Sequence, residues 1–528
     1  MILYKILKDK GYSVSDDIVK YYNDIELWHE WWKGYVAKFH KYVVIDDTGT
    51  TSLEFKRKHL NMAKKCCEDW ANLLLNDKTR IDVDGDSNSE TQKFLSGDEI
   101  EQNEGVLGRS HFWKNGNRAV EREFAQGTVC AILQLVNATT DGISLNAEDI
   151  KIKFIKDARM IVPLTYDDDE IIDIAIASQF VKNKERYIYL QIYEHQDDDR
   201  YLVSNGYYQI TETGEGYSQV GNMNGEVESY YMPCKPFFIM TPNIENNVSD
   251  VPLGISIYAN AIDNLKGIDL AFDNMFNDTL LGKKKVFMTQ SSMLMKTDVY
   301  VDEQGVKKDR IIHDVQGTLE KTLYVNVGEK IDPSAPPFMQ EYNPSLRTQE
   351  NKDSIQFYLN LFSNSVGLGQ SRYKFDVQTM NTATEAKISM KDLTESVWKQ
   401  RIQIQEVLKD MARSILIIGK EYCGANVDTK AKISIIFDDT MFNDEEAERL
   451  RFMQEISAGI KQKWEYRVKF EGEDEETARK MTGEEEGQQE DPTLADLYFN
   501  NDNSTVPEEG NTKKEENKQA KETGEEVK

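Results

Sequence analysis

The sequence predicts an α+β protein with several domains, and three observations lead to that prediction. The chain has 528 residues, which is too long for one ordinary hydrophobic core. Apolar residues recur at helical spacing on both sides of a stretch at about 150–240, where the spacing changes to the alternation of strands. With 39% hydrophobic and 30% charged residues, the composition fits a folded chain with a large hydrated surface.

Residues from about 16 to 80 are expected to be helical, because aromatic and aliphatic side chains recur there at spacings of three and four. Trp28, Trp31 and Trp32 fall in this stretch, and we interpret them as core or subunit-contact residues rather than a ligand-stacking platform. From about 150 to 240, β-branched runs are separated by acidic or glycine-containing turns. This pattern predicts an antiparallel meander of about four or five strands.

Three further helices are expected in the second half of the chain. Helical spacing of apolar residues predicts one helix over 252–281 and another over about 346–364. Between them, residues 286–340 mix short strands and turns, which indicates a small α/β excursion. The longest helix begins at a capping box, Thr382 to Glu385, and about 38 helical residues would span about 57 Å. Its apolar residues repeat every seven positions, at Met390, Val397, Ile404, Met411 and Ile418.

The end of the chain changes in composition. A strand with the sequence AKISIIFDD follows the long helix, and the acidic segment from about 440 to 482 has an amphipathic helical pattern. Beyond residue 483 the chain is dominated by Glu, Lys, Asn, Gly and Thr. Such a tail cannot bury enough apolar surface to offset its ordering entropy, so we expect it to be disordered.

The net charge of −28 excludes one large class of proteins. A protein that grips duplex DNA by neutralising phosphates needs concentrated Lys and Arg, and here the balance is the reverse. Nucleic acid is therefore either no partner or a partner that the protein must touch without holding.

The cysteines, the apolar runs and the first residues indicate the cellular compartment and whether the chain spans a membrane. The five cysteines are odd in number and scattered, which predicts synthesis in a reducing cytosol rather than a disulfide framework. No run of about 20 apolar residues is present, so we expect no membrane-spanning helix. The first residues, MILYKILKDKGYSVSDD, have no secretory-signal pattern.

Motifs for chemistry are weak throughout. The acidic stretch Asp82–Glu90 suggests a calcium loop, but its glycine falls at the fourth position and Lys93 occupies the place of the bidentate Glu. No HExxH, CxxC, GxxxxGK[ST] or GxSxG pattern occurs. We predict no catalytic residues, no cofactor and no metal, and hence no enzyme. An acidic, carboxylate-dependent hydrolase stays open as an alternative, because acidic residues are abundant.

The stretch VGLGQSRYKFDVQTMNTATEAKI, Val366–Ile388, separates two of the predicted helices. Between Leu368 and Glu385, the order GLG, YKFD and NTATEA before a long helix resembles the portal proteins of tailed bacteriophages, of the long-tailed siphophage type found with Gram-positive hosts. The segments ELWHEWWKGYVAKFHKY and MAKKCCEDWANLLLND resemble that family's N-terminal part. VPLGISIYANAIDNLKGIDLAFDNM resembles its first stem helix. The resemblance runs from about residue 20 to 480.

The resemblance implies a portal-protein fold with a helical and β-meander wing, a two-helix stem, a small α/β clip, a helical crown and a disordered acidic C-terminal tail. The implied divisions are wing 1–250, first stem helix 251–281, clip 282–345, second stem helix 346–364, tunnel loop 365–381, wing return with long helix and strand 382–439, crown 440–482 and tail 483–528.

The implied function is a homo-oligomeric ring, usually of twelve copies, at one vertex of the capsid. Double-stranded DNA would be packaged and later ejected through it without sequence preference. The implied partners are the terminase large subunit, the head–tail connector or adaptor proteins, and the major capsid and scaffolding proteins, with no membrane. Its place would be the virion after synthesis in the host cytoplasm. A non-channel structural virion protein is a further alternative.

The resemblance also marks a DNA-facing tunnel loop, made of Val366, Gly367, Leu368, Gly369, Gln370, Ser371, Arg372, Tyr373, Lys374, Phe375 and Asp376. The two glycines would let this loop shift as DNA passes. Arg372, Tyr373 and Lys374 are expected to approach phosphates, and Asp376 to offset their charge. The alternative, equally open, is that Tyr373 and Phe375 pack the loop against a helix.

Overall fold

The structure is a computed structural model that describes residues 2–45, 52–83, 89–98, 104–140, 145–168, 170–211, 216–221, 227–289, 294–301, 303–314, 323–327, 338–370, 372–375, 383–438, 445–472 and 474–482. The chain divides into two compact units, Met1–Asp439 and Thr440–Lys528, and each is described by itself. Helices and sheets are both extensive, which confirms the predicted α+β class. The predicted disordered tail and the cap of the long helix lie outside the described residues.

The helices of the larger unit are α1 (Ile2–Asp9), α2 (Asp16–Lys33), α3 (Ala37–His40), α4 (Met62–Leu74), α5 (Glu90–Ser96), α6 (Gly105–Arg109), α7 (Phe112–Gln126), α8 (Ile262–Leu281), α10 (Thr348–Ser365) and α11 (Ala383–Tyr422), with short 3-10 turns η1 (Ala158–Met160) and η2 (Ala259–Ala261). Trp28 and Trp31 are 2% and 3% exposed, so both are core residues. Trp32 is half-buried beside α7, where its Nε1 donates to Glu121.

The strands are β1 (Lys41–Ile45), β2 (Ser52–Lys56), β3 (Arg80–Val83), β4 (Val129–Val136), β5 (Thr139–Thr140), β6 (Leu145–Asn146), β7 (Asp149–Ile155), β8 (Ile161–Asp167), β9 (Glu170–Lys182), β10 (Glu185–His195), β11 (Tyr201–Ile210), β12 (Tyr217–Val220), β13 (Ser229–Met232), β14 (Phe237–Met240), β15 (Lys285–Met288), β16 (Leu294–Val301), β17 (Lys307–Asp314), β18 (Tyr324–Asn326), β19 (Met339–Tyr342) and β20 (Ile433–Ile436). The predicted meander is confirmed, because β8 to β12 pair in chain order as an antiparallel sheet.

Two parts of the strand pattern differ from the prediction. Strand β7 belongs to a separate sheet of order β14-β4-β7 rather than to the meander. The hairpin β1–β2 interrupts the region at 16–80 that was expected to be all helical. The hairpin sequence KYVVI is rich in β-branched residues, which favour strands over helices.

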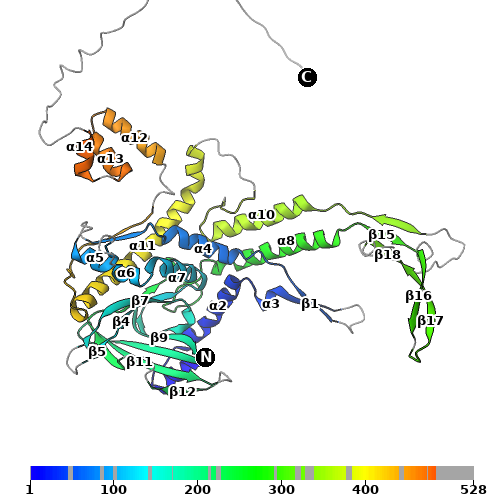
Figure 1. Cartoon of the computed structure of the whole chain (residues 1–528), viewed down its shortest axis with the longest axis horizontal. Helices are drawn as coiled ribbons and strands as arrows, with labels where there is room; N and C mark the ends of the chain where they lie inside the picture. Colours follow the sequence, from blue (N-terminus) through cyan, green and yellow to red (C-terminus); the bar gives the residue numbers. More distant parts are fainter. Residues whose placement is uncertain are drawn as a thin grey trace, which may run out of the picture. The chain divides into compact units, whose positions relative to one another are not determined.

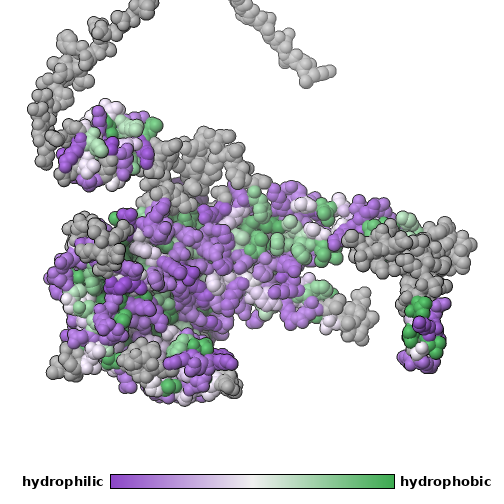
Figure 2. All heavy atoms as spheres, viewed as in Figure 1, coloured by the Kyte–Doolittle hydropathy of each residue, from purple (hydrophilic) through white to green (hydrophobic). Residues whose placement is uncertain are grey.

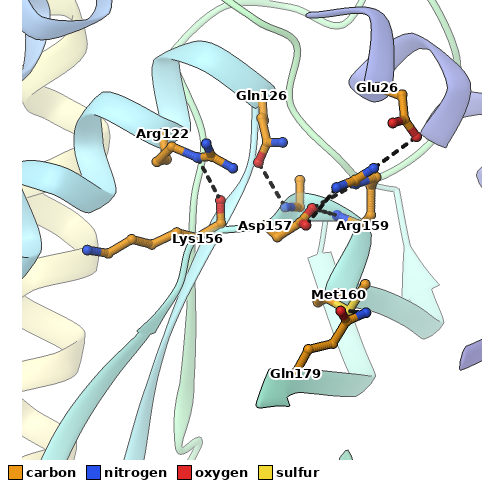
Figure 3. Close-up of polar contacts among 9 residues, drawn as sticks. Glu26, Arg122, Gln126, Lys156, Asp157, Arg159, Met160 and Gln179 are labelled. Carbon is orange, nitrogen blue, oxygen red and sulfur yellow. Dashed lines mark hydrogen bonds and ion pairs between the residues drawn. The ribbon is translucent and has the colours of Figure 1, made fainter. Parts of the chain in front are cut away.

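Polar contacts tie α2 and α7 to the connection between β7 and β8 (Figure 3). Arg159 donates from Nε and Nη2 to the two carboxylate oxygens of Asp157, each at 2.9 Å, and from Nη1 to Glu26 Oε2 at 2.9 Å. The Gln126 side chain accepts from Ala158 N at 3.2 Å. Because Glu26 lies on α2 and Gln126 ends α7, these bonds hold both helices against the sheet edge.

The helix predicted over 252–281 is wrong at its start, since α8 begins only at Ile262. The residues before it form a buried, irregular segment that caps the end of α7. Ser256 Oγ and Ile257 N both donate to Phe124 O, at 3.1 and 3.0 Å, and Tyr258 Oη donates to Ala125 O at 3.1 Å. The last turn of a helix leaves carbonyls unpaired, and this segment satisfies them. Its apolar spacing therefore reflects burial rather than a helix.

Helices α8 and α10 form an antiparallel pair that extends from the body of the larger unit (Figure 1). At one end Asn264 donates to Ser365 Oγ at 3.1 Å, and at the other Arg347 binds both oxygens of Asp278 at 2.8 and 3.2 Å. Strands β15, β18 and β19 form a small sheet beyond the pair, and β16 and β17 form a hairpin.

Helix α11 is confirmed as the longest helix, with 40 residues. Its heptad residues Met411 and Ile418 are 1% and 0% exposed, in contact with a core that includes β14 and β20. Strand β20 pairs with β3, which brings the end of the larger unit back to its N-terminal part. The smaller unit contains α12 (Glu445–Ser457), α13 (Lys463–Glu471) and α14 (Glu475–Thr482), as its amphipathic pattern predicts.

Candidate functional site

The predicted DNA-facing residues connect the end of α10 to the approach to α11. The structure describes this segment as residues 366–370 and 372–375, and Ser371 and Asp376 lie outside the described residues. Its beginning is a helix end rather than an open loop. Gly367 N donates to Asn364 O at 3.2 Å, and Leu368 N donates to Ser363 O at 3.0 Å.

These two bonds form a Schellman motif, in which the residue after the helix adopts a left-handed backbone. Gly367 occupies that position with φ of +77°. The glycine is therefore explained by helix termination. Val366 and Leu368 on either side of it are 1% and 3% exposed. Gly369 also has positive φ, at +73°, and its carbonyl accepts from the Ser363 hydroxyl.

Helix α4 holds both ends of this segment. Trp70 Nε1 donates to Val366 O at 3.1 Å. The neighbouring Asp69 accepts from Arg372 Nη2 at 3.2 Å and from the Tyr373 hydroxyl at 3.0 Å. Lys65, one helical turn before Asp69, donates to the same carboxylate at 2.5 Å. Val366, Arg372 and Tyr373 are thus fastened to the side of α4.

The Tyr373 side chain is packed inward. Its ring lies 6.5 Å from the Phe362 ring in a stacked orientation. Burial, with the nearby Asp69 carboxylate, raises the pKa of Tyr373 far above its usual value, so that the hydroxyl remains a donor. For Tyr373, this geometry supports the alternative in which the ring packs the loop against a helix.

Exposure increases abruptly after Tyr373. The Gln356 side chain of α10 donates to Tyr373 O at 3.1 Å and accepts from Phe375 N at 2.9 Å, so it fixes the backbone at this point. Lys374 is exposed, and the Phe375 side chain is 49% exposed. Within the described ranges, no ion pair involves Lys374, whereas Arg372 is paired with Asp69. Of the predicted cations, Lys374 is the one that faces solvent.

Sequence reasoning missed Asp69, Trp70 and Gln356 as partners of this segment. A signal for Asp69 was present, because it lies on the apolar face of α4 with Cys66 and Trp70. A carboxylate in such a position needs a cationic or donor partner. Nothing in the sequence says that the partner is 303 residues away.

The rest of the described structure gives little sign of catalytic chemistry. No group of three or more His, Cys, Asp or Glu side chains that could hold a metal ion occurs among the described residues. A cavity of about 630 Å³ lies between α11 and the chain around β14, and its acidic lining residues are Glu170, Glu245 and Asp410. The helices in the described ranges include none that is long and apolar enough to cross a membrane.

Over residues 20–491, the sequence matches the family described as phage portal protein, SPP1 Gp6-like. The chain belongs to this portal family. The resemblance seen at Leu368–Glu385 is thereby confirmed. The protein is a bacteriophage portal protein, a component of the virion with a part in DNA packaging. No curated protein matches the sequence.

The family match covers the helix pair α8 and α10 and the segment at 366–375. Portal proteins are structural proteins of the capsid.

Proposed function

We propose that copies of this portal protein close into a ring at one capsid vertex, and that double-stranded DNA is packaged and later ejected through the central channel. The family match over 20–491 is the observation on which this proposal rests. Axial negative-stain images of the purified protein test it. A closed annulus with a central hole is expected, and a compact monomer or dimer would refute the proposal.

The helix pair α8 and α10 supports a ring, because it carries apolar side chains with no cover in one subunit (Figure 2). The side chains that are at least 40% exposed on or beside this pair are Leu270, Phe276, Leu280, Leu281, Leu346, Phe357 and Leu361. A closed ring needs two different complementary faces on each subunit. Burying these side chains against the next copy would supply about 25 cal/mol per Å² of apolar surface.

Phe357→Asp is expected to prevent ring closure while leaving the subunit folded. Phe357 is 59% exposed, so a charge there would cost the isolated fold little, within about 0.5 kcal/mol. In a subunit interface the same charge would be desolvated. Sedimentation velocity would show the loss of the large species, and circular dichroism would show an unchanged fold. Phe357→Leu is the matched control and should still assemble, whereas rings formed equally by both variants would exclude this face.

The excess of acidic residues supports a channel through which DNA slides rather than a surface that binds DNA tightly. Electrostatic screening acts over about 8 Å at physiological salt, so wall charges affect DNA only where the bore is narrow. A mostly acidic wall prevents long-lived binding, and a few cations at the narrowest point make brief contacts with phosphates. Lys374 is proposed to supply such a contact. Arg372 contributes less, because Asp69 already pairs with it.

Lys374→Ala is expected to lower packaging severalfold without affecting ring assembly. The side chain is exposed and makes no described ion pair, so its removal leaves the fold intact. A DNase-protection assay on packaging extracts measures the effect. Lys374→Arg should keep activity, and exposed Lys182→Ala on β9 serves as a charge-matched control. Normal packaging by Lys374→Ala would remove this side chain from the mechanism.

A docking surface is proposed at the far end of the helix pair. The strands β15 to β19, within 282–345, lie beyond the far end of α8 and α10 (Figure 1) and are proposed as the clip that binds the terminase large subunit and later the head–tail connector proteins. Residues 440–482 of the smaller unit are proposed as the crown inside the capsid.

A further inference from the structure

The anchoring of residues 366–373 raises the question of which part of the proposed tunnel loop moves. Two neighbouring residues of α4 hold it from both ends, Trp70 at Val366 and Asp69 at Arg372 and Tyr373. Both carboxylate oxygens of Asp69 are used, and the residue is 4% exposed. Charge-assisted bonds at a buried carboxylate are among the stronger polar contacts in proteins.

Helix α4 is itself firmly placed. Trp70 is 1% exposed, and its ring stacks on Phe124 of α7 with centroids 5.3 Å apart. On the other side of the segment, a Cβ built on Gly367 would lie 3.4 Å from Ser396 Cβ of α11. The beginning of the segment is therefore enclosed between α4 and α11, with little space to shift.

Both glycines are held by hydrogen bonds to the end of α10. Gly367 completes the Schellman motif at the end of α10, and the Gly369 carbonyl is held by Ser363. Beyond them, the Gln356 amide fixes the backbone from Tyr373 to Phe375. Polar contacts to the helices thus continue as far as Phe375 N.

We propose that Asp69 is a positioning residue that fixes the root of the tunnel loop, residues 366–373, to α4. This root then does not shift as DNA passes, and α4 sets the point at which the loop enters the channel. The attachment of the root to α4 is a property of the single subunit. Its effect on the passage of DNA rests on the proposed function.

The attachment is tested by amide hydrogen exchange on assembled protein. Asp69→Asn keeps the size of the side chain but removes its charge, and exchange over 366–373 is expected to become at least tenfold faster. Lys65→Met removes a different partner of the same carboxylate and should leave this exchange unchanged, because Arg372 and Tyr373 still hold it. Unchanged exchange in Asp69→Asn would overturn the proposal.

A second variant keeps the test decisive if Asp69→Asn does not fold. Tyr373→Phe removes only the hydroxyl that donates to Asp69. It should accelerate exchange over 366–373 while leaving the melting temperature and ring assembly close to those of the parent. A loss of global stability without local acceleration would mean that the contact is merely structural, which contradicts the proposal.

That the root does not move is tested by a crosslink. Disulfides need Cβ atoms about 3.5–4.5 Å apart, and positions 367 and 396 are near that range. Gly367→Cys combined with Ser396→Cys would lock the root when oxidised. Packaging by the oxidised and reduced forms is expected to be equal, because the root does not move. Packaging by the reduced form alone would restore the glycines as the hinge. If the parent packages DNA but neither form of the double variant does, the amide hydrogen exchange of Asp69→Asn still decides whether the root is attached to α4.

Discussion

Gly127→Ala is expected to destabilise the larger unit by at least about 4 kcal/mol, a large part of the roughly 5–15 kcal/mol by which ordinary proteins are stable. Gly127 follows α7 with φ of +83°, and a Cβ there would lie 2.1 Å from the Gly254 carbonyl oxygen. That carbonyl cannot easily retreat, because Tyr21 donates to it at 2.9 Å and the Thr128 hydroxyl accepts from Gly254 N at 3.0 Å.

Urea unfolding followed by circular dichroism measures this loss. Gly11→Ala is the matched control, because Gly11 has a similar φ of +95° with nothing within 4 Å of the added Cβ. It should cost only the backbone strain, about 1 kcal/mol. Equal losses in the two variants would show that the contact between Gly127 and Gly254 is not tight.

Glu123→Gln is expected to stabilise the protein near neutral pH by on the order of 3 kcal/mol. Glu123 on α7 is 1% exposed, and its Oε2 has no hydrogen-bond partner. Burial raises the pKa of this carboxyl from 4.5 to about 8. The folded state therefore has to keep a proton that the unfolded state releases, and glutamine removes that requirement.

The pH dependence has a definite sign. The folded pKa is above the unfolded one, so the parent loses stability as the pH rises from about 4.5 to about 8 and no further beyond that. The stability of Glu123→Gln should equal that of the parent below this window, exceed it increasingly across the window, and exceed it by a constant amount above about pH 8. Urea midpoints at several pH values measure the difference, with exposed Glu228→Gln as the control. Parallel pH profiles for Glu123→Gln and the parent would contradict the assigned burial effect.

Much of the fold could be predicted from local patterns. The meander β8 to β11 and the helices α10 and α11 follow directly from alternation and helical spacing. Prediction failed where burial imitated a helical pattern, as at 252–261, where tertiary contacts to α7 replace helical hydrogen bonds. It also failed for β1 and β2, which lie between two helices.

The candidate site also has a part that the sequence predicts and a part that it does not. The position of Gly367 just after a helix was readable, because glycine commonly ends helices with a left-handed backbone. The contacts of Arg372 and Tyr373 with Asp69 were not, because they join residues more than 300 positions apart. Such pairing depends on how α4 and α10 pack in the folded chain. The side-chain pattern along one helix does not show which other helix lies beside it.

The amino-acid sequence by itself determined the α+β class, the acidic balance, most helices and strands, and the membership in the portal family, because these depend on local spacing, on composition and on motifs in order. Only the tertiary structure decided that residues 366–373 are held by α4 and that Lys374 is the exposed cation. Burial and pairing of a charge are properties of its whole surroundings, and those surroundings are assembled from distant parts of the chain.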